Sequence, residues 1–214
     1  MITETCEQTW QALPLPGADV RYASSWLEKD EADILLEQLR DEISWEQHQF
    51  LMFGREVTAP RLSCWIGDPG ATYVYSRTRF EPRAWTPSLI PLRARLEQFC
   101  STRFNSVLAN LYRDGRDSMG WHSDDEPELG EEPVIASLSL GATRRFRLRR
   151  RLPRGTRPTS ADTLDLLLTH GSLLCMAGDT QRLYQHDLPK SAAVAAPRIN
   201  LTFRYIHTPP SRRP

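Results

Sequence analysis

The segment GWHSDDE at residues 120–126 combines side chains that bind metal ions. His122 and Asp124 are two residues apart, and such residues point to the same side of an extended segment. His186, in YQHDL much further along the chain, could supply a third ligand from another strand. Two histidines and one carboxylate form the facial triad that holds non-haem iron(II) and leaves positions open for a co-substrate and O₂.

A structural interpretation of the same residues stays open at this point. The pattern HxD is short, and three of the five histidines, His48, His170 and His207, offer other ligands. In this alternative His122 is a turn residue and His186 is a surface residue.

The segment PRINLTFRYI carries polar side chains at every second position. These side chains share one face of a strand because the strand period is two: Arg198, Asn200, Thr202 and Arg204. The face is either exposed to solvent or the wall of a cavity. In a cavity, the two arginines could address opposite ends of a small dicarboxylate, since arginine pairs bidentately with carboxylates. Asn110 and Tyr112, on one face of VLANLYR, could add hydrogen bonds.

Apolar spacing predicts the elements that must position these residues. Residues 30–43 and 88–100 have the one-face periodicity of amphipathic helices. After residue 105 the period changes to two, and short strands follow in LDLLLT, SLLCMAG, RLYQHDL and RINLTFRYI. PVIASLSLGA and RRFRLRR are expected to pair around a turn at Gly141–Ala142. Helices followed by about eight strands predict an α+β protein with a jelly-roll or barrel core.

Composition limits the kinds of partner. Formal net charge is +0, so any attraction to nucleic acid must come from local patches. No apolar stretch is long enough to span a membrane, and the N-terminus lacks a signal peptide, so we expect a cytoplasmic protein of bacterial type. The cysteines Cys6, Cys64, Cys100 and Cys175 form no CxxC pair and are expected to be reduced.

Arginines are concentrated between residues 144 and 157. They are Arg144, Arg145, Arg147, Arg149, Arg150, Arg151, Arg154 and Arg157. Such a run is either a solvated face or a track for DNA phosphates. We favour contact with the DNA backbone, because this run of positive charge stands out in a protein whose formal net charge is +0.

Five motifs occur in order: NLYRDG (110–115), HSDDEPEL (122–129), PVIASLSLGA (133–142), HDLPK (186–190) and RINLTFR (198–204). Together they resemble the AlkB-type nucleic-acid dealkylases, and in particular their duplex-DNA-repair branch. FGREVTAPRLSCWIGDPGATYVYS (53–76) extends the similarity to about residues 50–206. The resemblance implies a double-stranded β-helix core with N-terminal helices and a hairpin lid. It also implies iron(II), 2-oxoglutarate and O₂ as cofactor and co-substrates.

The resemblance implies a role for each matching residue. His122, Asp124 and His186 match the iron ligands. The positions that match 2-oxoglutarate-binding residues are Asn110, Tyr112, Arg198, Thr202 and Arg204. We add Asn200 to this set because it shares their strand face, and we count Arg204 also as catalytic.

Other matches concern the base that is repaired. Tyr73, Tyr75 and Ser76 match the wall of a base pocket, although Tyr75 stands where the branch is expected to have phenylalanine. Asp125 and Glu126 match positions that touch the damaged base. Phe53, Gly54 and the adjacent Arg55 fall in a hairpin finger that probes the base stack. A base must leave the duplex to reach a buried metal, and Phe53 could wedge into the space it leaves.

The implied reaction removes N-alkyl groups, such as those of 1-methyladenine and 3-methylcytosine, and releases succinate, CO₂ and formaldehyde. The expected partner is alkylated DNA, duplex or single-stranded, and the expected state is a monomer. Two alternatives stay open: the same chemistry on RNA or a protein side chain, and a non-catalytic DNA-binding module.

The predicted organisation is one dioxygenase domain over residues 21–206. Within it, residues 21–105 hold the helices and the nucleotide-recognition lid, and residues 106–206 hold the core. Residues 1–20 are expected to be a flexible lead-in, and residues 207–214 a C-terminal tail.

Overall fold

Three helices occur in the computed structural model, which describes residues 9–52, 55–75, 78–153 and 155–207. They are α1 (Lys29–Glu42), α2 (Leu89–Cys100) and the short α3 (Thr180–Leu183). The first two confirm the predicted helices. In α1, Ala32, Leu35 and Leu39 form the buried stripe, and Asp30 and Glu31 lie in the first turn, where negative charge favours the helix dipole.

The strands form two antiparallel sheets. The large sheet has the order β1 (Gln11–Ala12), β2 (Asp19–Ala23), β13 (Ser172–Ala177), β10 (Ile135–Gly141), β15 (Arg198–Arg204), β8 (Ser106–Tyr112) and β5 (Leu62–Gly67). The small sheet has the order β12 (Thr163–Leu168), β11 (Arg144–Arg150), β14 (Tyr184–Leu188) and β9 (Met119–His122). Two hairpins stand apart from both sheets: β3 (Gln49–Met52) with β4 (Arg55–Thr58), and β6 (Tyr73–Tyr75) with β7 (Thr78–Phe80).

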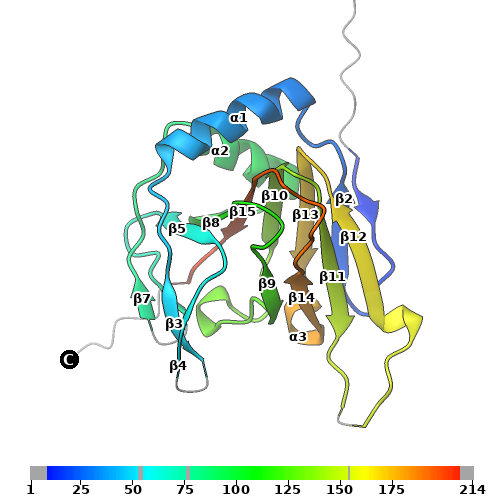
Figure 1. The fold of residues 1–214 in the computed structure, drawn as a ribbon. Coiled ribbons are helices and arrows are strands. Elements are labelled where there is room, and N and C mark those ends of the chain that lie inside the picture. The colour runs from blue at the N-terminus through cyan, green and yellow to red at the C-terminus, as the bar shows by residue number, and fades with distance from the viewer. Residues whose placement is uncertain (1–8, 53–54, 76–77, 154, 208–214) are drawn as a thin grey trace, which may run out of the picture.

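The large sheet is the middle layer of the molecule. Helices α1 and α2 cover one of its faces, and the small sheet lies against the other (Figure 1). Leu138, Leu201 and Phe203 belong to the core under the helices, whereas Met176, Phe146 and Leu148 belong to the core between the sheets. Two sheets packed face to face make the predicted jelly roll.

The predicted pairing of residues 133–142 with residues 144–150 is wrong. β10 pairs with β13 and β15, and β11 pairs with β12 and β14, so the turn at Gly141 carries the chain from one sheet to the other. Gly141 has φ of 86°, and a Cβ there would lie 2.5 Å from the Pro197 carbonyl oxygen. Only glycine fits this corner, since it has no Cβ.

The region predicted to be a flexible lead-in also differs from expectation. β1 and the first residues of β2 lie within residues 1–20, and β2 pairs with β13 in the large sheet. Val20 and Tyr22 are buried between the two sheets, which fixes β2 in the large sheet. The outer domain boundaries stay a prediction. Within the described residues, no helix has the length and apolar character needed to cross a membrane.

Candidate active site

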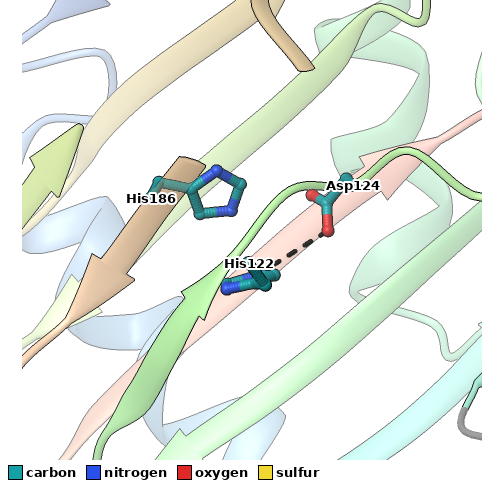
Figure 2. A group of neighbouring side chains, drawn as sticks. All are labelled: His122, Asp124 and His186. Carbon is teal, nitrogen blue, oxygen red and sulfur yellow. Dashed lines mark ion pairs between the residues drawn. The ribbon is translucent and has the colours of Figure 1, made fainter. Parts of the chain in front are cut away.

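The strand register brings the two predicted histidine ligands together. His122 ends β9 and lies directly opposite His186 of β14. Asp124 follows two residues later, where the chain has left the strand. Figure 2 shows the three side chains converging, with His122 at the end of β9, Asp124 on the loop that follows it and His186 on β14. One ligand atom from each residue lies within 4.8 Å of the others. This spacing suits three ligands that bind one face of a single metal ion.

Contacts with neighbouring groups set the tautomer of His122 and hold His186 and Asp124 in position. The Nδ1 of His122 lies 2.8 Å from the Gly120 carbonyl oxygen. A carbonyl only accepts, so Nδ1 carries the proton and Nε2 keeps its lone pair for a metal. The ring of His186 packs against the ring of Phe146, and the two ring centres are 5.3 Å apart. The backbone N–H of Asp124 donates to Gln181 Oε1 at 2.9 Å.

The electrostatic environment keeps all three side chains in the form that binds metal. Burial lowers the pKa of His122, and burial together with the charge of His122 lowers the pKa of His186 to about 3. Burial alone would raise the pKa of Asp124, but the charge of Arg204 and the two histidines hold it at about 2. Two neutral imidazoles and one carboxylate are therefore present at neutral pH.

The polar face of β15 lines a pocket between the sheets and is not exposed to solvent. Arg198 and Arg204 are only 1% and 3% exposed, so the interpretation as a solvated face is wrong. The pocket holds the three metal-binding side chains, and all six predicted 2-oxoglutarate-binding residues line it beside them. These six are Asn110, Tyr112, Arg198, Asn200, Thr202 and Arg204.

The two arginines of β15 have different partners. Arg204 donates through Nη2 to Asp124 Oδ1 at 2.7 Å, so it lies at the metal end. Arg198 donates through Nη2 to Ser139 Oγ at 2.9 Å. Among the described residues, its Nε and Nη1 have no partner with hydrogen-bond geometry. A buried guanidinium with unsatisfied donors fits a carboxylate, so these residues suit a dicarboxylate that also reaches the metal.

The asparagines are already hydrogen-bonded within the protein. Asn200 Nδ2 donates to Ser137 Oγ at 2.8 Å and to the Leu138 carbonyl oxygen at 3.0 Å. Asn110 Oδ1 accepts from Nε of Arg61 at 2.9 Å. Both side chains are thereby held rigidly at the pocket wall.

The residues predicted to touch the base lie outside this pocket or outside the described residues. Asp125 is exposed, and its Oδ2 accepts from Arg151 Nη2 at 2.6 Å, while Glu126 is half-buried at the next position. Arg55 begins β4, and Tyr73 and Tyr75 bound β6; the structure describes only their backbone. Phe53, Gly54 and Ser76 lie outside the described residues.

Fewer arginines of the cluster are available for contact with DNA phosphates than the sequence implies. Arg144 points inward and is 1% exposed, so its predicted place on a surface track is wrong. Arg145 pairs with Asp165, and Arg147 donates to Asp187 at 2.8 Å. Arg151 pairs with Asp125, as described above, and Arg149 donates to Gln185 and stacks 4.1 Å from the centre of the Trp121 ring. Arg154 lies outside the described residues.

Sequence reasoning missed two buried polar residues beside the site, Gln181 and Arg61, and it did not predict that Arg144 is buried. Gln181 holds the backbone of Asp124, and Arg61 holds the side chain of Asn110. The apolar spacing of an element carries no signal for such contacts, because each depends on a partner far along the chain. The competing histidines are excluded, since His122, Asp124 and His186 are the metal-binding group found among the described residues.

Comparison with known proteins agrees with this geometry. Residues 19–204 match the 2OG-Fe(II) oxygenase superfamily. Alpha-ketoglutarate-dependent dioxygenase alkB homolog 3 of Mus musculus is 44% identical over 187 residues, which are 86% of this chain and 65% of the mouse protein. The chain thus spans just under two thirds of that relative. DNA oxidative demethylase ALKBH2 of Mus musculus is 38% identical over 92% of this chain and 84% of its own length.

Solved structures show the same fold at low sequence identity. OsALKBH1 superposes with a TM-score of 0.63 at 17% identity, over 92% of this chain and all of that one. An oxidoreductase of the 2OG-Fe(II) oxygenase family from Burkholderia pseudomallei has a TM-score of 0.54 at 15% identity, over 91% of this chain and 89% of its own. The triad, the two-sheet core and these matches agree: the chain belongs to the 2OG-Fe(II) oxygenase superfamily, among the AlkB homologues.

Proposed function

We propose that this chain is an iron(II)- and 2-oxoglutarate-dependent dioxygenase that removes N-alkyl groups from DNA bases. The observation that supports this most is the pocket itself. Its wall carries the three metal-binding side chains together with polar side chains from β8 and β15. A protein that only bound DNA would have no use for this combination.

Each pocket residue has a physical role in the proposal. His122, Asp124 and His186 would hold iron(II), which with 2-oxoglutarate and O₂ supplies the oxidising chemistry. Arg198 would anchor the distal carboxylate through its unsatisfied N–H groups. Phe146 and Leu188, which also line the pocket, exclude water from the reacting atoms.

DNA is the proposed substrate class because of the relative named DNA oxidative demethylase ALKBH2. Asp124 and His186 are buried and His122 is half-buried, so a base would have to be flipped out of its stack to reach them. Asp125 and Glu126 directly follow Asp124 and are proposed to contact that base. Glu126, when ionised, only accepts hydrogen bonds, which suits a lesion base with a positive charge or an exocyclic N–H.

In the proposed reaction, an N-methyl carbon becomes a hydroxymethyl group and then leaves as formaldehyde, while 2-oxoglutarate becomes succinate and CO₂. With 2-oxoglutarate and O₂ added, we expect anaerobically reconstituted protein to form succinate from 2-oxoglutarate and to release formaldehyde from oligonucleotides that carry 1-methyladenine or 3-methylcytosine. Mass spectrometry of the oligonucleotide and a formaldehyde assay would measure this. An unmethylated oligonucleotide of the same sequence and a reaction without iron are the controls. Absence of repair above these controls would rule out the proposal.

The same assay on duplex DNA, single-stranded DNA, RNA and a methylated peptide would identify the substrate class. Higher turnover of RNA or peptide than of either DNA would favour the alternative substrates. Monomeric state and cytoplasmic location stay predictions from the sequence.

The proposed finger at Phe53 and Gly54 has its own test. Phe53→Ala is expected to impair repair of duplex DNA more than repair of single-stranded DNA, because only the duplex needs a wedge in its base stack. Rates on matched duplex and single-stranded substrates would be compared. An equal loss on both substrates would contradict the role of Phe53 as a finger.

A further inference from the structure

Arg144 is a buried cation without an acidic partner in direct contact. It begins β11 and is 1% exposed. Its Nη1 donates to the Asp114 carbonyl oxygen at 3.2 Å, and its Nη2 donates to the carbonyl oxygens of Asp117 and Pro189 at 2.8 and 2.7 Å. Nε has no hydrogen-bond partner among the described residues. Among the described residues, its direct hydrogen-bond partners are therefore backbone carbonyl oxygens alone, and the Asp117 and Asp114 carboxylates act on its charge without a hydrogen bond.

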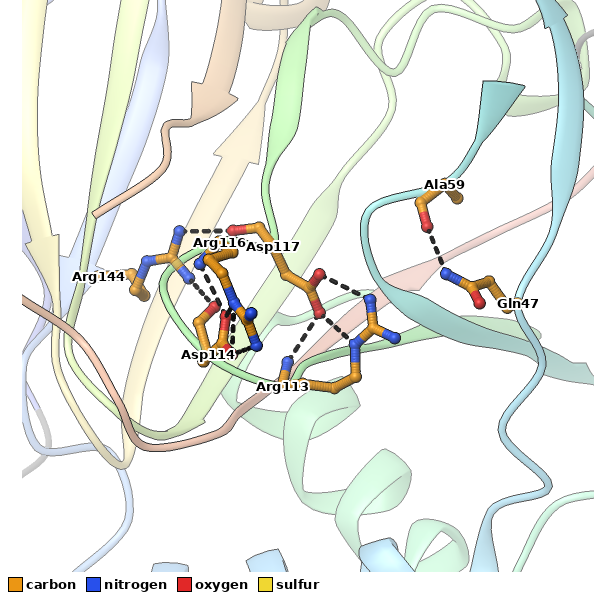
Figure 3. Close-up of polar contacts among 7 residues, drawn as sticks. All are labelled: Gln47, Ala59, Arg113, Asp114, Arg116, Asp117 and Arg144. Atoms are coloured by element: carbon orange, nitrogen blue, oxygen red, sulfur yellow. Dashed lines mark hydrogen bonds and ion pairs between the residues drawn. The ribbon is translucent and has the colours of Figure 1, made fainter. Parts of the chain in front are cut away.

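The nearest carboxylates are engaged by other arginines. Figure 3 shows Arg144 facing the backbone of the 113–118 loop, while the acids of that loop turn to other partners. The Asp117 carboxylate accepts from Nε and Nη2 of Arg113, both at 2.8 Å. The Asp114 carboxylate accepts from Arg116 Nη2 at 2.6 Å. Neither acid has a side-chain hydrogen bond to Arg144, so the positive charge at this end of the pocket stays in excess.

Arg144 and a second buried arginine, Arg198, both lie over the ring of Tyr112. The guanidinium carbon of Arg144 is 5.8 Å from the centre of the Tyr112 ring, and that of Arg198 is 5.4 Å from it. Burial lowers the pKa of Arg198 to about 10, and the charge of Arg144 acts in the same direction. Two neighbouring buried cations are stabilised by an anion between or beside them.

We propose that Arg144 is a positioning residue for the co-substrate and sets its preference for a dicarboxylate. Arg198 and Tyr112 line the pocket, whereas Arg144 lies over the Tyr112 ring and is not among the lining residues. Arg144 adds positive potential where the distal carboxylate is expected, and it ties the 113–118 loop to β11. This inference rests on the proposed co-substrate and is independent of which base is repaired.

The test compares two ligands of equal carbon number that differ only in the distal carboxylate: 2-oxoglutarate and 2-oxopentanoate. Both would be titrated calorimetrically into manganese(II)-loaded protein, so that no turnover occurs during the measurement. For Arg144→Met we expect the Kd of 2-oxoglutarate to rise roughly tenfold and that of 2-oxopentanoate less than about twofold, because a charge acts mainly on a charge. Arg144→Lys should retain most of the preference, since it keeps the positive charge.

Arg145→Met is the matched control. It removes a cation from the next position of the same strand, where the side chain is exposed and paired with Asp165, and both Kd values should stay at the wild-type level. An equal loss for both ligands in Arg144→Met would reduce Arg144 to a packing role and overturn the inference. Unchanged binding of both would also overturn it. If the wild type bound no 2-oxoglutarate, the proposed function itself would fail.

Discussion

His186→Ala is expected to abolish 2-oxoglutarate turnover and to weaken metal binding by more than roughly 100-fold. Loss of a group that only hydrogen-bonds to a metal ligand already lowers metal affinity about 10- to 100-fold. His186 belongs to the metal-binding group itself, so its loss should cost more. The side chain is 5% exposed, so a solvent molecule would have to enter a largely closed site to replace it. Succinate release would measure turnover, and titration with cobalt(II) would measure metal affinity.

His207→Ala is the matched control for this variant. His207 is exposed, and its ring stacks edge-on against Tyr205 at 5.0 Å, outside the pocket. Turnover and metal affinity should stay at the wild-type level. Equal turnover in wild type and His186→Ala would refute the assignment of the metal ligands. Thermal unfolding of the metal-free proteins would show that both variants are folded.

Arg204→Met is expected to lower the free energy of unfolding of the metal-free protein by about 3–5 kcal/mol, the usual cost of removing one partner of a buried ion pair. Arg204 and Asp124 are each only 3% exposed, and their closest atoms are 2.7 Å apart. The substitution leaves a buried carboxylate without this cation. Chemical denaturation would measure the difference.

Two further variants separate this effect from general packing. Arg204→Met combined with Asp124→Asn should recover part of the loss, because the second change removes the uncompensated charge. Arg40→Met removes an exposed arginine that pairs with Glu37, and it should cost no more than about 1 kcal/mol. A similar cost for Arg204→Met and Arg40→Met would contradict the importance of the buried pair.

The surface available to nucleic acid is smaller than the number of arginines implies. Arg145, Arg147 and Arg151 each pair with an acid, and Arg144 faces inward. These pairs reduce the charge that the cluster offers to phosphates. Contact between the remaining arginines and DNA stays a prediction.

The local spacing of apolar and polar residues was enough to predict several secondary-structure elements of this protein and the faces that they bury. The apolar stripe of α1 and the alternation in β8 and β15 are properties of neighbouring residues, so the sequence alone predicted these elements and their polar faces. The spacing of His122 and Asp124 likewise predicted two ligands on one side. The resemblance to AlkB-type proteins then connected these local patterns to one site.

The tertiary structure decided which residues meet. Whether the polar face of β15 lies in water or in a pocket depends on the small sheet that covers it, and His122 meets His186 only through the register of β9 with β14. The switch of the chain between sheets at Gly141 brings Arg144 beside Tyr112, which the spacing of the arginines does not reveal. Such contacts join residues far apart in the chain, so local spacing cannot predict them.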